Sequence, residues 1–226
     1  MSVSKIKATV FSQEQLASDV FSMWLEVGSI ASEAKPGQFI SVYSNDDSKL
    51  LPRPISICEI DRENGRLRIV YRVVGYGTKE FSGCKAGDTL EIMGPLGNGY
   101  TLKKDKAILV AGGIGVPPML ELAKELDCEK TIVLGYRDEL FLNKEFEQYG
   151  KVVIATEDGS CGTKGNVLDA IRAESVDGQV IYSCGPTPML RALKQYAADK
   201  GIEAWISLEE KMACGIGACL ACVCKS

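Results

Sequence analysis

The sequence contains no histidine. This absence excludes Ser-His-Asp and Cys-His catalysis, histidine-ligated zinc, Rieske centres and histidine-ligated haem. No stretch approaches the roughly 18 uninterrupted apolar residues of a transmembrane helix, and the N-terminus has no apolar core of signal-peptide length. We therefore expect a soluble, cytoplasmic protein whose chemistry relies on cysteine, carboxylates, lysine, arginine, tyrosine or a bound cofactor.

An excess of positive charge is also absent. The chain has 26 Lys and Arg against 30 Asp and Glu, a net charge of -4. It therefore lacks the positive field that attracts phosphate backbones, and nucleic acid is excluded as a partner. With 226 residues, 46% apolar and 25% charged, the composition is typical of a globular protein of one large or two modest domains.

Cysteine is too scarce for a disulfide scaffold, but it is concentrated at one end. Nine cysteines in 226 residues are about 4%, whereas disulfide scaffolds have roughly 8 to 10%. Five are scattered singly, and the other four lie between residues 214 and 224. In a reducing compartment such a cluster indicates a metal site rather than disulfides.

Residues 1–100 are predicted to form an antiparallel β-domain. Alternation is clearest over residues 66–74, where Leu67 and Ile69 share one face and Arg66 and Arg68 share the other. Regularly spaced short strands of this kind predict a sandwich or a small barrel. The other β-rich runs, separated by turn signals, are residues 5–11, 20–27, 39–43, 55–60 and 89–93.

Strands and helices alternate after the glycine-rich residues 94–99, which we interpret as a domain junction. Residues 107–111 form a continuous apolar run of buried-strand type, and a helical pattern follows. This rhythm predicts a parallel α/β sheet with ligands at the carboxyl ends of its strands. Further buried strands are expected at residues 131–135, 152–156, 180–183 and 205–208.

Two strand-to-helix turns are candidate nucleotide loops. Residues 112–115 read Gly-Gly-Ile-Gly, and backbone N–H groups at a helix start favour a pyrophosphate. The loop is not the G-x-G-x-x-G fingerprint, because Pro118 occupies the third glycine's place, so a plain turn is the alternative. The second turn, residues 183–189, would border the same crevice; alternatively, Cys184 is a small buried hydrophobe.

Two weaker signals lie in the β-domain. Arg53 offers a fork to a diphosphate, and Gly77 with Thr78 offers N–H groups and a hydroxyl to the same group. Taken singly, each is more typical of an ordinary surface arginine or turn. The cysteine spacing is far more specific, because Cys214, Cys219 and Cys222 have the C-x4-C-x2-C arrangement of plant-type [2Fe-2S] ligands.

Together these motifs resemble, in order, those of the ferredoxin-reductase-like flavoproteins, and most closely the electron transfer subunits of class B dihydroorotate dehydrogenases. The resemblance covers essentially the whole chain. It implies an N-terminal antiparallel FAD-binding β-barrel (residues 1–100), a parallel α/β NAD-binding domain (101–208) and a C-terminal [2Fe-2S] segment (209–226). The motifs that carry it are residues 53–56, 70–78, 94–97, 112–115 and 184–189 and the final cysteines.

The resemblance also implies a function in pyrimidine biosynthesis. Electrons would come from an FMN-binding catalytic subunit that oxidises dihydroorotate, in a heterotetramer with two copies of each chain. They would pass through the [2Fe-2S] cluster and FAD to NAD+. It assigns Arg53, Pro54, Ile55, Ser56, Val70, Tyr71, Arg72, Gly77 and Thr78 to FAD, Gly113, Gly115 and Asp158 to NAD, Cys184 to the nicotinamide, and Cys214, Cys219 and Cys222 to the cluster.

Two features depart from the family pattern. Ile55 replaces the tyrosine that stacks on the flavin in many ferredoxin reductases. The family's fourth cluster cysteine lies about a dozen residues after the third, whereas this chain ends at Ser226 and Cys224 is a poor substitute. We therefore expect that this chain is C-terminally shortened and that its tail from Cys214 onward is mobile. Such a chain should bind flavin but lack a stoichiometric cluster.

Other functions remain open on the sequence alone. The chain would share most motifs with the small subunit of a ferredoxin:NADP or sulfide-linked oxidoreductase, or with a free-standing NADH-dependent flavin reductase. A cofactor-free assembly subunit is a further alternative, which visible colour would exclude. The preference for NAD over NADP rests on the resemblance, because Arg137 and Asp138 have opposite effects on a 2′-phosphate.

Overall fold

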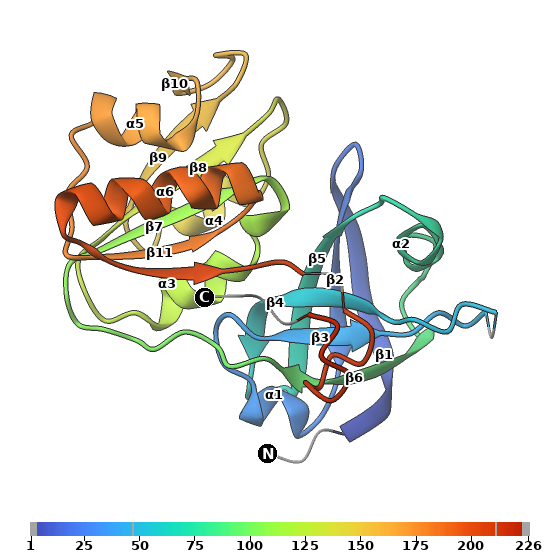
Figure 1. Cartoon of the computed structure of the whole chain (residues 1–226). Coiled ribbons are helices and arrows are strands. Elements are labelled where there is room, and N and C mark those ends of the chain that lie inside the picture. Colours follow the sequence, from blue (N-terminus) through green and yellow to red (C-terminus); the bar gives the residue numbers. More distant parts are fainter. Residues whose placement is uncertain (1–3, 47, 211, 223–226) are drawn as a thin grey trace. The chain divides into compact units, whose positions relative to one another are not determined.

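The structure is a computed structural model that describes residues 4–46, 48–210 and 212–222 (Figure 1). Its contacts divide the chain into two compact units. One unit contains Met1–Gly99 together with Glu209–Ser226, and the other contains Tyr100–Leu208. The cysteine-rich segment therefore belongs to the same unit as the N-terminal strands.

The first unit is a closed antiparallel barrel, as the sequence predicts. Its strands follow the order β1-β2-β5-β4-β3-β6, and β6 pairs with β1 to close the ring. Two short helices, α1 (Ile30–Glu33) and α2 (Tyr76–Phe81), connect strands. The strands are β1 (Ser4–Ala17), β2 (Val20–Glu26), β3 (Phe39–Val42), β4 (Arg53–Asp61), β5 (Arg66–Arg72) and β6 (Thr89–Leu96).

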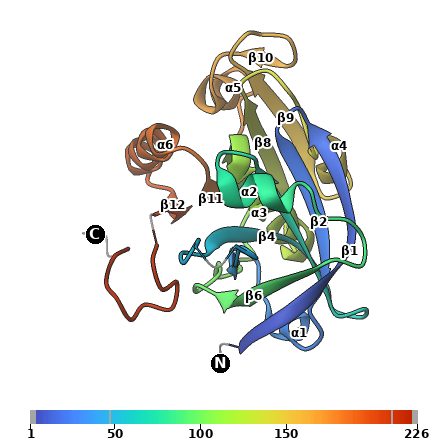
Figure 2. The ribbon, with the colours of Figure 1, turned by 90° about the vertical axis from the view of Figure 1, so that its right-hand side faces the viewer.

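Strand β1 closes the barrel because it pairs on both sides. Its first half pairs with β6, and its second half forms a long hairpin with β2 (Figure 2). Register shifts between Val10 and Ser12 and between Gln15 and Ala17 bend the strand. The prediction of a strand over residues 5–11 was too short, because the polar residues 12–15 lack the apolar alternation that marks a strand.

The alternation in β5 sorts its side chains between the core and the outer face. Leu67 and Ile69 are fully buried inside the barrel, where they pack with residues of every other barrel strand. Arg68 lies on the outer face but is also buried, with only 5% of its surface exposed. A buried guanidinium is costly unless its charge and donors are satisfied.

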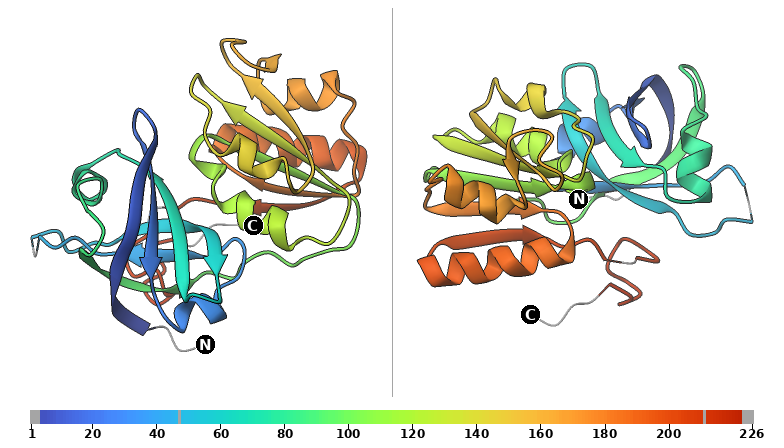
Figure 3. Two further views of the ribbon diagram at one scale, coloured as in Figure 1. Left: turned by 180° about the vertical axis from the view of Figure 1, so that it is seen from behind. Right: turned by 90° about the horizontal axis from the view of Figure 1, so that it is seen from above.

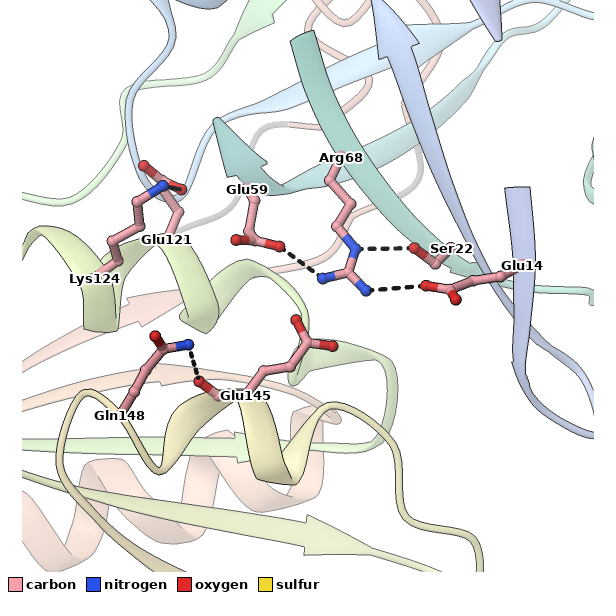
Figure 4. A network of polar contacts seen from close by, with 8 residues as sticks. All are labelled: Glu14, Ser22, Glu59, Arg68, Glu121, Lys124, Glu145 and Gln148. Atoms are coloured by element: carbon pink, nitrogen blue, oxygen red, sulfur yellow. Dashed lines mark hydrogen bonds and ion pairs between the residues drawn. The ribbon is translucent and has the colours of Figure 1, made fainter. Parts of the chain in front are cut away.

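Three other strands of the barrel supply those partners (Figure 4). Arg68 Nη1 donates to Glu59 Oε2 at 2.6 Å, and Arg68 Nε donates to Ser22 Oγ at 2.9 Å. Arg68 Nη2 lies 3.4 Å from Glu14 Oε1. One side chain thus ties β5 to β4, β2 and β1 on the outside of the barrel.

The second unit is an α/β structure with a fully parallel sheet. The strand order is β10-β9-β8-β7-β11-β12. From β7 the chain adds strands toward one edge of the sheet, and from β11 it adds them toward the other edge, so the strand order reverses between β7 and β11. In open parallel sheets this switch point is where ligands bind. The strands are β7 (Ala107–Gly112), β8 (Lys130–Tyr136), β9 (Lys151–Thr156), β10 (Thr163–Lys164), β11 (Val180–Cys184) and β12 (Glu203–Ser207).

Helices cover both faces of this sheet (Figure 3). α5 (Val167–Ala173) and α6 (Thr187–Lys200) share a core with Ile108, Val110 and Ile181, while α3 (Pro118–Glu125) and α4 (Asn143–Phe146) lie on the opposite face. Asn166 caps α5 by accepting hydrogen bonds from Leu168 N and Asp169 N. No helix in the described residues is long and apolar enough to span a lipid bilayer.

The Arg68 network gives a testable stability difference. Arg68→Met keeps the side chain's bulk but leaves the Glu59 carboxylate without its cation, which should lower the free energy of unfolding of the barrel by about 3 to 5 kcal/mol. Urea unfolding followed by Trp24 fluorescence measures this in a Trp205→Phe background, because the chain has two tryptophans. As a control, Lys5→Met removes an exposed pair with Glu91 at 2.7 Å and should have a much smaller effect. Equal losses in the two variants would contradict this account.

Candidate cofactor-binding sites

Arg53 and Gly77 lie together in the barrel unit, although 24 positions separate them in the sequence. Arg53 begins β4, and Gly77 lies in the first turn of α2. A Cβ atom at Gly77 would lie 3.1 Å from Arg53 Nε and 3.3 Å from Arg53 Cγ. Glycine therefore lets the guanidinium pack against the helix start, where a positive charge and backbone N–H groups are both suited to a diphosphate.

The Thr78 hydroxyl is occupied inside this turn. Its Oγ1 accepts hydrogen bonds from Val74 N at 3.0 Å and Gly75 N at 3.2 Å, and it donates to Gly75 O at 3.1 Å. A hydroxyl has one donor and two acceptor sites, so all three are used. The sequence predicted that this hydroxyl would face a diphosphate. In the structure it fixes the N-terminal turn of α2 instead, and only the Thr78 backbone is left to meet a ligand.

Strand alternation divides the remaining expected flavin residues into two groups. Ile55 and Tyr71 are buried within the barrel, where the Tyr71 hydroxyl donates to Gln13 Oε1 at 2.9 Å and the ring packs edge-on against Phe81. Burial raises the pKa of Tyr71 well above its usual range. These two residues can meet a ligand only through their backbone. Alternation places Pro54, Ser56, Val70 and Arg72 on the outer face of the barrel. Val70 is nevertheless buried, with 3% of its surface exposed, and Arg72 lies 3.1 Å from the carboxylate of Asp19.

At the switch point of the parallel sheet, the loops after β7 and β11 touch backbone to backbone. A Cβ atom at Gly115 would lie only 2.4 Å from the Cys184 carbonyl oxygen, and one at Gly185 would lie 3.1 Å from Gly112 N. Gly113 differs, because its φ is +53° and a Cβ there would meet nothing within 4 Å. Gly115 thus permits the contact between loops, while Gly113 faces open space where a phosphate can approach the chain.

Cys184 is the last residue of β11, and its side chain is half-buried. It is in register with Ala111 of β7 and Ser207 of β12, so it lies at the carboxyl edge of the sheet beside the glycine loop. Met189 fills the space between the two loops, since a Cβ at Gly112 would lie 2.7 Å from its sulfur. The sequence gave no sign of this contact.

Asp158 lies in the loop after β9, at the same edge of the sheet. Its Oδ1 accepts hydrogen bonds from Ser160 N at 3.0 Å and Ser160 Oγ at 2.7 Å. The backbone bond from Ser160, followed by the side-chain bond, holds the pKa of Asp158 below its usual range. Asp158 is therefore an ionised, exposed residue that shapes its own loop.

The cysteine-rich segment forms a loop whose backbone N–H groups stabilise a cysteine thiolate. Gly215 and Gly217 have φ of +70° and +78°, and these turns bring Cys219 N to 3.4 Å from Cys214 Sγ. Backbone N–H groups of Cys219 and Ile216 lower the pKa of the Cys214 thiol to about 6. This donor set fits an iron–sulfur cluster, whose ligands are thiolates surrounded by N–H groups.

The three thiols are not arranged as a preformed metal cage. Within residues 4–46, 48–210 and 212–222, no group of three Cys, Asp or Glu side chains is placed to hold a metal ion. Cys224, the poor fourth ligand of the sequence analysis, lies outside the described residues. The segment packs on the barrel, because a Cβ at Gly215 would lie 3.1 Å from Ser41 Oγ and 3.3 Å from Leu96 Cδ1.

The contact between the loops after β7 and β11 predicts that a methyl group added at Gly115 destabilises the second unit. Gly115→Ala forces the Cys184 carbonyl to move and should lower the free energy of unfolding of the second unit by about 1 to 3 kcal/mol. Trp205 fluorescence during urea unfolding, in a Trp24→Phe background, measures this unit. As a control, Gly201→Asn places a side chain at a helix end with φ of +64° and open space around it, and asparagine tolerates that conformation. A Gly115→Ala variant as stable as the Gly201→Asn variant would disprove the close approach.

Known families match both ends of the chain. Residues 7–100 match the oxidoreductase FAD-binding domain, and residues 209–226 match the iron-sulfur cluster binding domain of dihydroorotate dehydrogenase B. Among solved structures, the chain is similar to one described as an NADH-dependent reduced ferredoxin-NADP oxidoreductase, with a TM-score of 0.88, 32% identity and coverage of 95% of this chain and 80% of that chain. A ferredoxin reductase in carbazole 1,9a-dioxygenase shares the fold, with a TM-score of 0.76, 21% identity and coverage of 92% and 70%.

Curated relatives agree with these matches. The dihydroorotate dehydrogenase B (NAD+) electron transfer subunit of Fusobacterium nucleatum is 44% identical over 231 residues, which cover 96% of this chain and 88% of the relative. The subunit of the same name from Streptococcus pneumoniae is also 44% identical, over 96% of this chain and 87% of its own length. The chain therefore belongs to the family of dihydroorotate dehydrogenase B (NAD+) electron transfer subunits.

Proposed function

We propose that this chain carries electrons from a catalytic partner subunit, which oxidises dihydroorotate on FMN, to NAD+. Dihydroorotate loses two electrons and two protons, and NAD+ accepts two electrons and one proton. The observation that supports this most is the packing of Gly215, in a segment that matches the cluster-binding domain of this enzyme class, against Ser41 and Leu96 of the flavin barrel. One unit thus carries the candidate flavin residues together with three cysteine ligands for the cluster.

Arg53 is the residue we assign to the FAD diphosphate. Its guanidinium lies against Gly77 at the start of α2, and Thr78 keeps that turn in shape. Ser56, Val70 and Arg72 would line the cofactor from the outer face of the barrel, while Ile55 and Tyr71 support it from inside. When bound, FAD supplies the centre that exchanges single electrons on one side and a hydride on the other.

Cys214, Cys219 and Cys222 are the residues we assign to the [2Fe-2S] cluster, which supplies one-electron transfer when bound. Ile216 and Leu220 of the same segment are 53% and 71% exposed. Exposed apolar side chains next to redox ligands suit a surface that a protein partner covers. We propose that the catalytic subunit covers them, in a cytoplasmic heterotetramer with two copies of each chain.

The second unit would bind NAD. Gly113 offers open backbone to the pyrophosphate, Cys184 lies where the nicotinamide would enter the crevice, and Asp158 shapes one wall. Asp138 follows β8, and its Oδ1 accepts a hydrogen bond from Glu139 N at 2.8 Å. Two carboxylates at this strand end, Asp138 and Glu139, would repel the 2′-phosphate of NADP despite Arg137, so we propose NAD as the nucleotide.

One alternative donor has an observation in its favour. The similarity to the ferredoxin-NADP oxidoreductase structure, at 32% identity over 95% of this chain, makes reduced ferredoxin a second candidate. The curated relatives at 41 to 44% identity and the matched cluster segment favour dihydroorotate.

Reconstitution with each donor separates the two functions. The chain, loaded with FAD, iron and sulfide, is combined anaerobically with its dihydroorotate-oxidising partner and NAD+, and NADH formation is followed by absorbance. We expect NADH to form with dihydroorotate and the partner, and NADPH to form more slowly when NADP+ replaces NAD+. Reduced ferredoxin alone should give neither product. NADH formation from ferredoxin without the partner would contradict the proposal.

The flavin assignment predicts a selective loss of FAD affinity. Arg53→Ala removes a charge-assisted hydrogen bond to the diphosphate, worth roughly 1.5 to 3 kcal/mol, so the Kd for FAD should rise about tenfold to over a hundredfold. Flavin fluorescence titration of the apoprotein measures the Kd. Arg62→Ala is the matched control, since Arg62 Nη2 donates to the Ala34 carbonyl at 3.1 Å, much as Arg53 Nη1 donates to the Leu51 carbonyl at 2.9 Å. Similar Kd values for the two variants would refute the role of Arg53.

A further inference from the structure

Tyr100, the first residue of the second unit, places its hydroxyl at the carboxyl end of the parallel sheet. Its OH donates to the Ser183 carbonyl at 3.0 Å. Ser183 lies next to the last residue of β11. The phenol therefore anchors the start of the second unit to the carboxyl end of this strand.

The Tyr100 ring is fixed in this position from two sides. It packs edge-on against Tyr182, with ring centroids 5.5 Å apart and planes at 85°, and the hydroxyl lies 3.8 Å from Met119 Sδ. Burial raises the pKa of Tyr100 well above its usual range, so the phenol stays neutral and remains a donor throughout the physiological pH range. A locked ring with a neutral hydroxyl is suited to holding a carbonyl in one place.

The carbonyl that Tyr100 holds belongs to the peptide bond that precedes Cys184. On the other side of Cys184, its own carbonyl is confined by Gly115, where an added Cβ would lie 2.4 Å away. Because side chains alternate along a strand, Cys184 shares a face of β11 with Tyr182, the face on which Tyr100 packs. Both peptide bonds of Cys184 are thus restrained, one by a hydrogen bond and the other by close packing.

We propose that Tyr100 is a positioning residue for Cys184, and that its hydrogen bond to Ser183 fixes where the thiol meets the nicotinamide. This inference rests on the proposed function, which puts Cys184 at the nicotinamide. It assigns a role in hydride transfer to a residue that the sequence motifs do not include. Small displacements of a group that orients reactants have large effects on rate, so removal of one hydroxyl should change the rate more than the affinity.

The test compares two variants, each of which loses one tyrosine hydroxyl at a different position. Tyr100→Phe removes the bond to Ser183 and keeps the ring. Tyr182→Phe removes a hydroxyl that donates to Thr101 O at 2.8 Å and accepts from Lys103 N at 3.0 Å. Both variants weaken the attachment of residues 100–103 to β11, but only the first frees the strand end at Cys184.

Anaerobic stopped-flow reduction of the FAD-loaded chain by NADH provides the readout. For Tyr100→Phe we expect flavin reduction to slow by about tenfold, a larger kinetic isotope effect with NADH deuterated at C4, and little change in the NADH concentration at half-maximal rate. Tyr182→Phe should retain the rate and the isotope effect of the unmodified chain. Tyr100→Phe with an unchanged rate and isotope effect, or Tyr182→Phe with an equal loss of rate, would overturn the inference.

A Cys184→Ala variant separates failure of this inference from failure of the proposed function. If Cys184→Ala slows reduction and Tyr100→Phe does not, the role of Tyr100 is wrong and the nicotinamide site stands. If Cys184→Ala has no effect, the assignment of Cys184 fails, and the role of Tyr100 fails with it. When both roles hold, the double variant should be about as slow as Cys184→Ala alone, because Tyr100 acts through Cys184.

Discussion

The backbone contact between the loops after β7 and β11 is the constraint on which the nucleotide unit depends. The strand order places these two strands side by side at the switch point, and Gly115 allows the Cys184 carbonyl to approach to a distance that no side chain would permit. Because the loops are held together there, Gly113 is left with open space, and Cys184 is held at the carboxyl edge of the sheet. In the proposed function, phosphate binding and nicotinamide placement would both depend on this one packing contact.

In the barrel unit, the alternation of side chains along each strand determines which residues can contact a ligand. Each residue of β4 and β5 faces either the core or the outer surface, so only alternate residues of a flavin motif can reach a ligand with their side chains. Arg68 ties β5 to three other strands of the barrel on its outer face, next to Val70 and Arg72. The cluster-binding segment belongs to this unit, so the flavin and cluster residues share one scaffold.

Periodicity predicted the antiparallel β-domain and the parallel sheet, because these depend on residues near one another in sequence, but it left a sandwich and a barrel open. The family resemblance implied the barrel. The second half of β1 was missed since its polar residues pair through a bulged register with no apolar alternation. The internal use of the Thr78 hydroxyl and the contact of Tyr100 with Ser183, 83 positions away, depend on the folded chain. No local pattern encodes them, and the roles of Ile55 and Tyr71 could be limited to the backbone only once their burial was known.

The proposed function requires that one chain hold a flavin site and a nicotinamide site that exchange a hydride. Its most direct test is an anaerobic titration of the isolated, FAD-loaded chain with NADH, followed by the visible absorbance of the flavin. We expect the flavin band to bleach with one NADH per bound FAD, without any partner subunit. A flavin that remains oxidised in excess NADH, in a chain that retains its FAD, would contradict it.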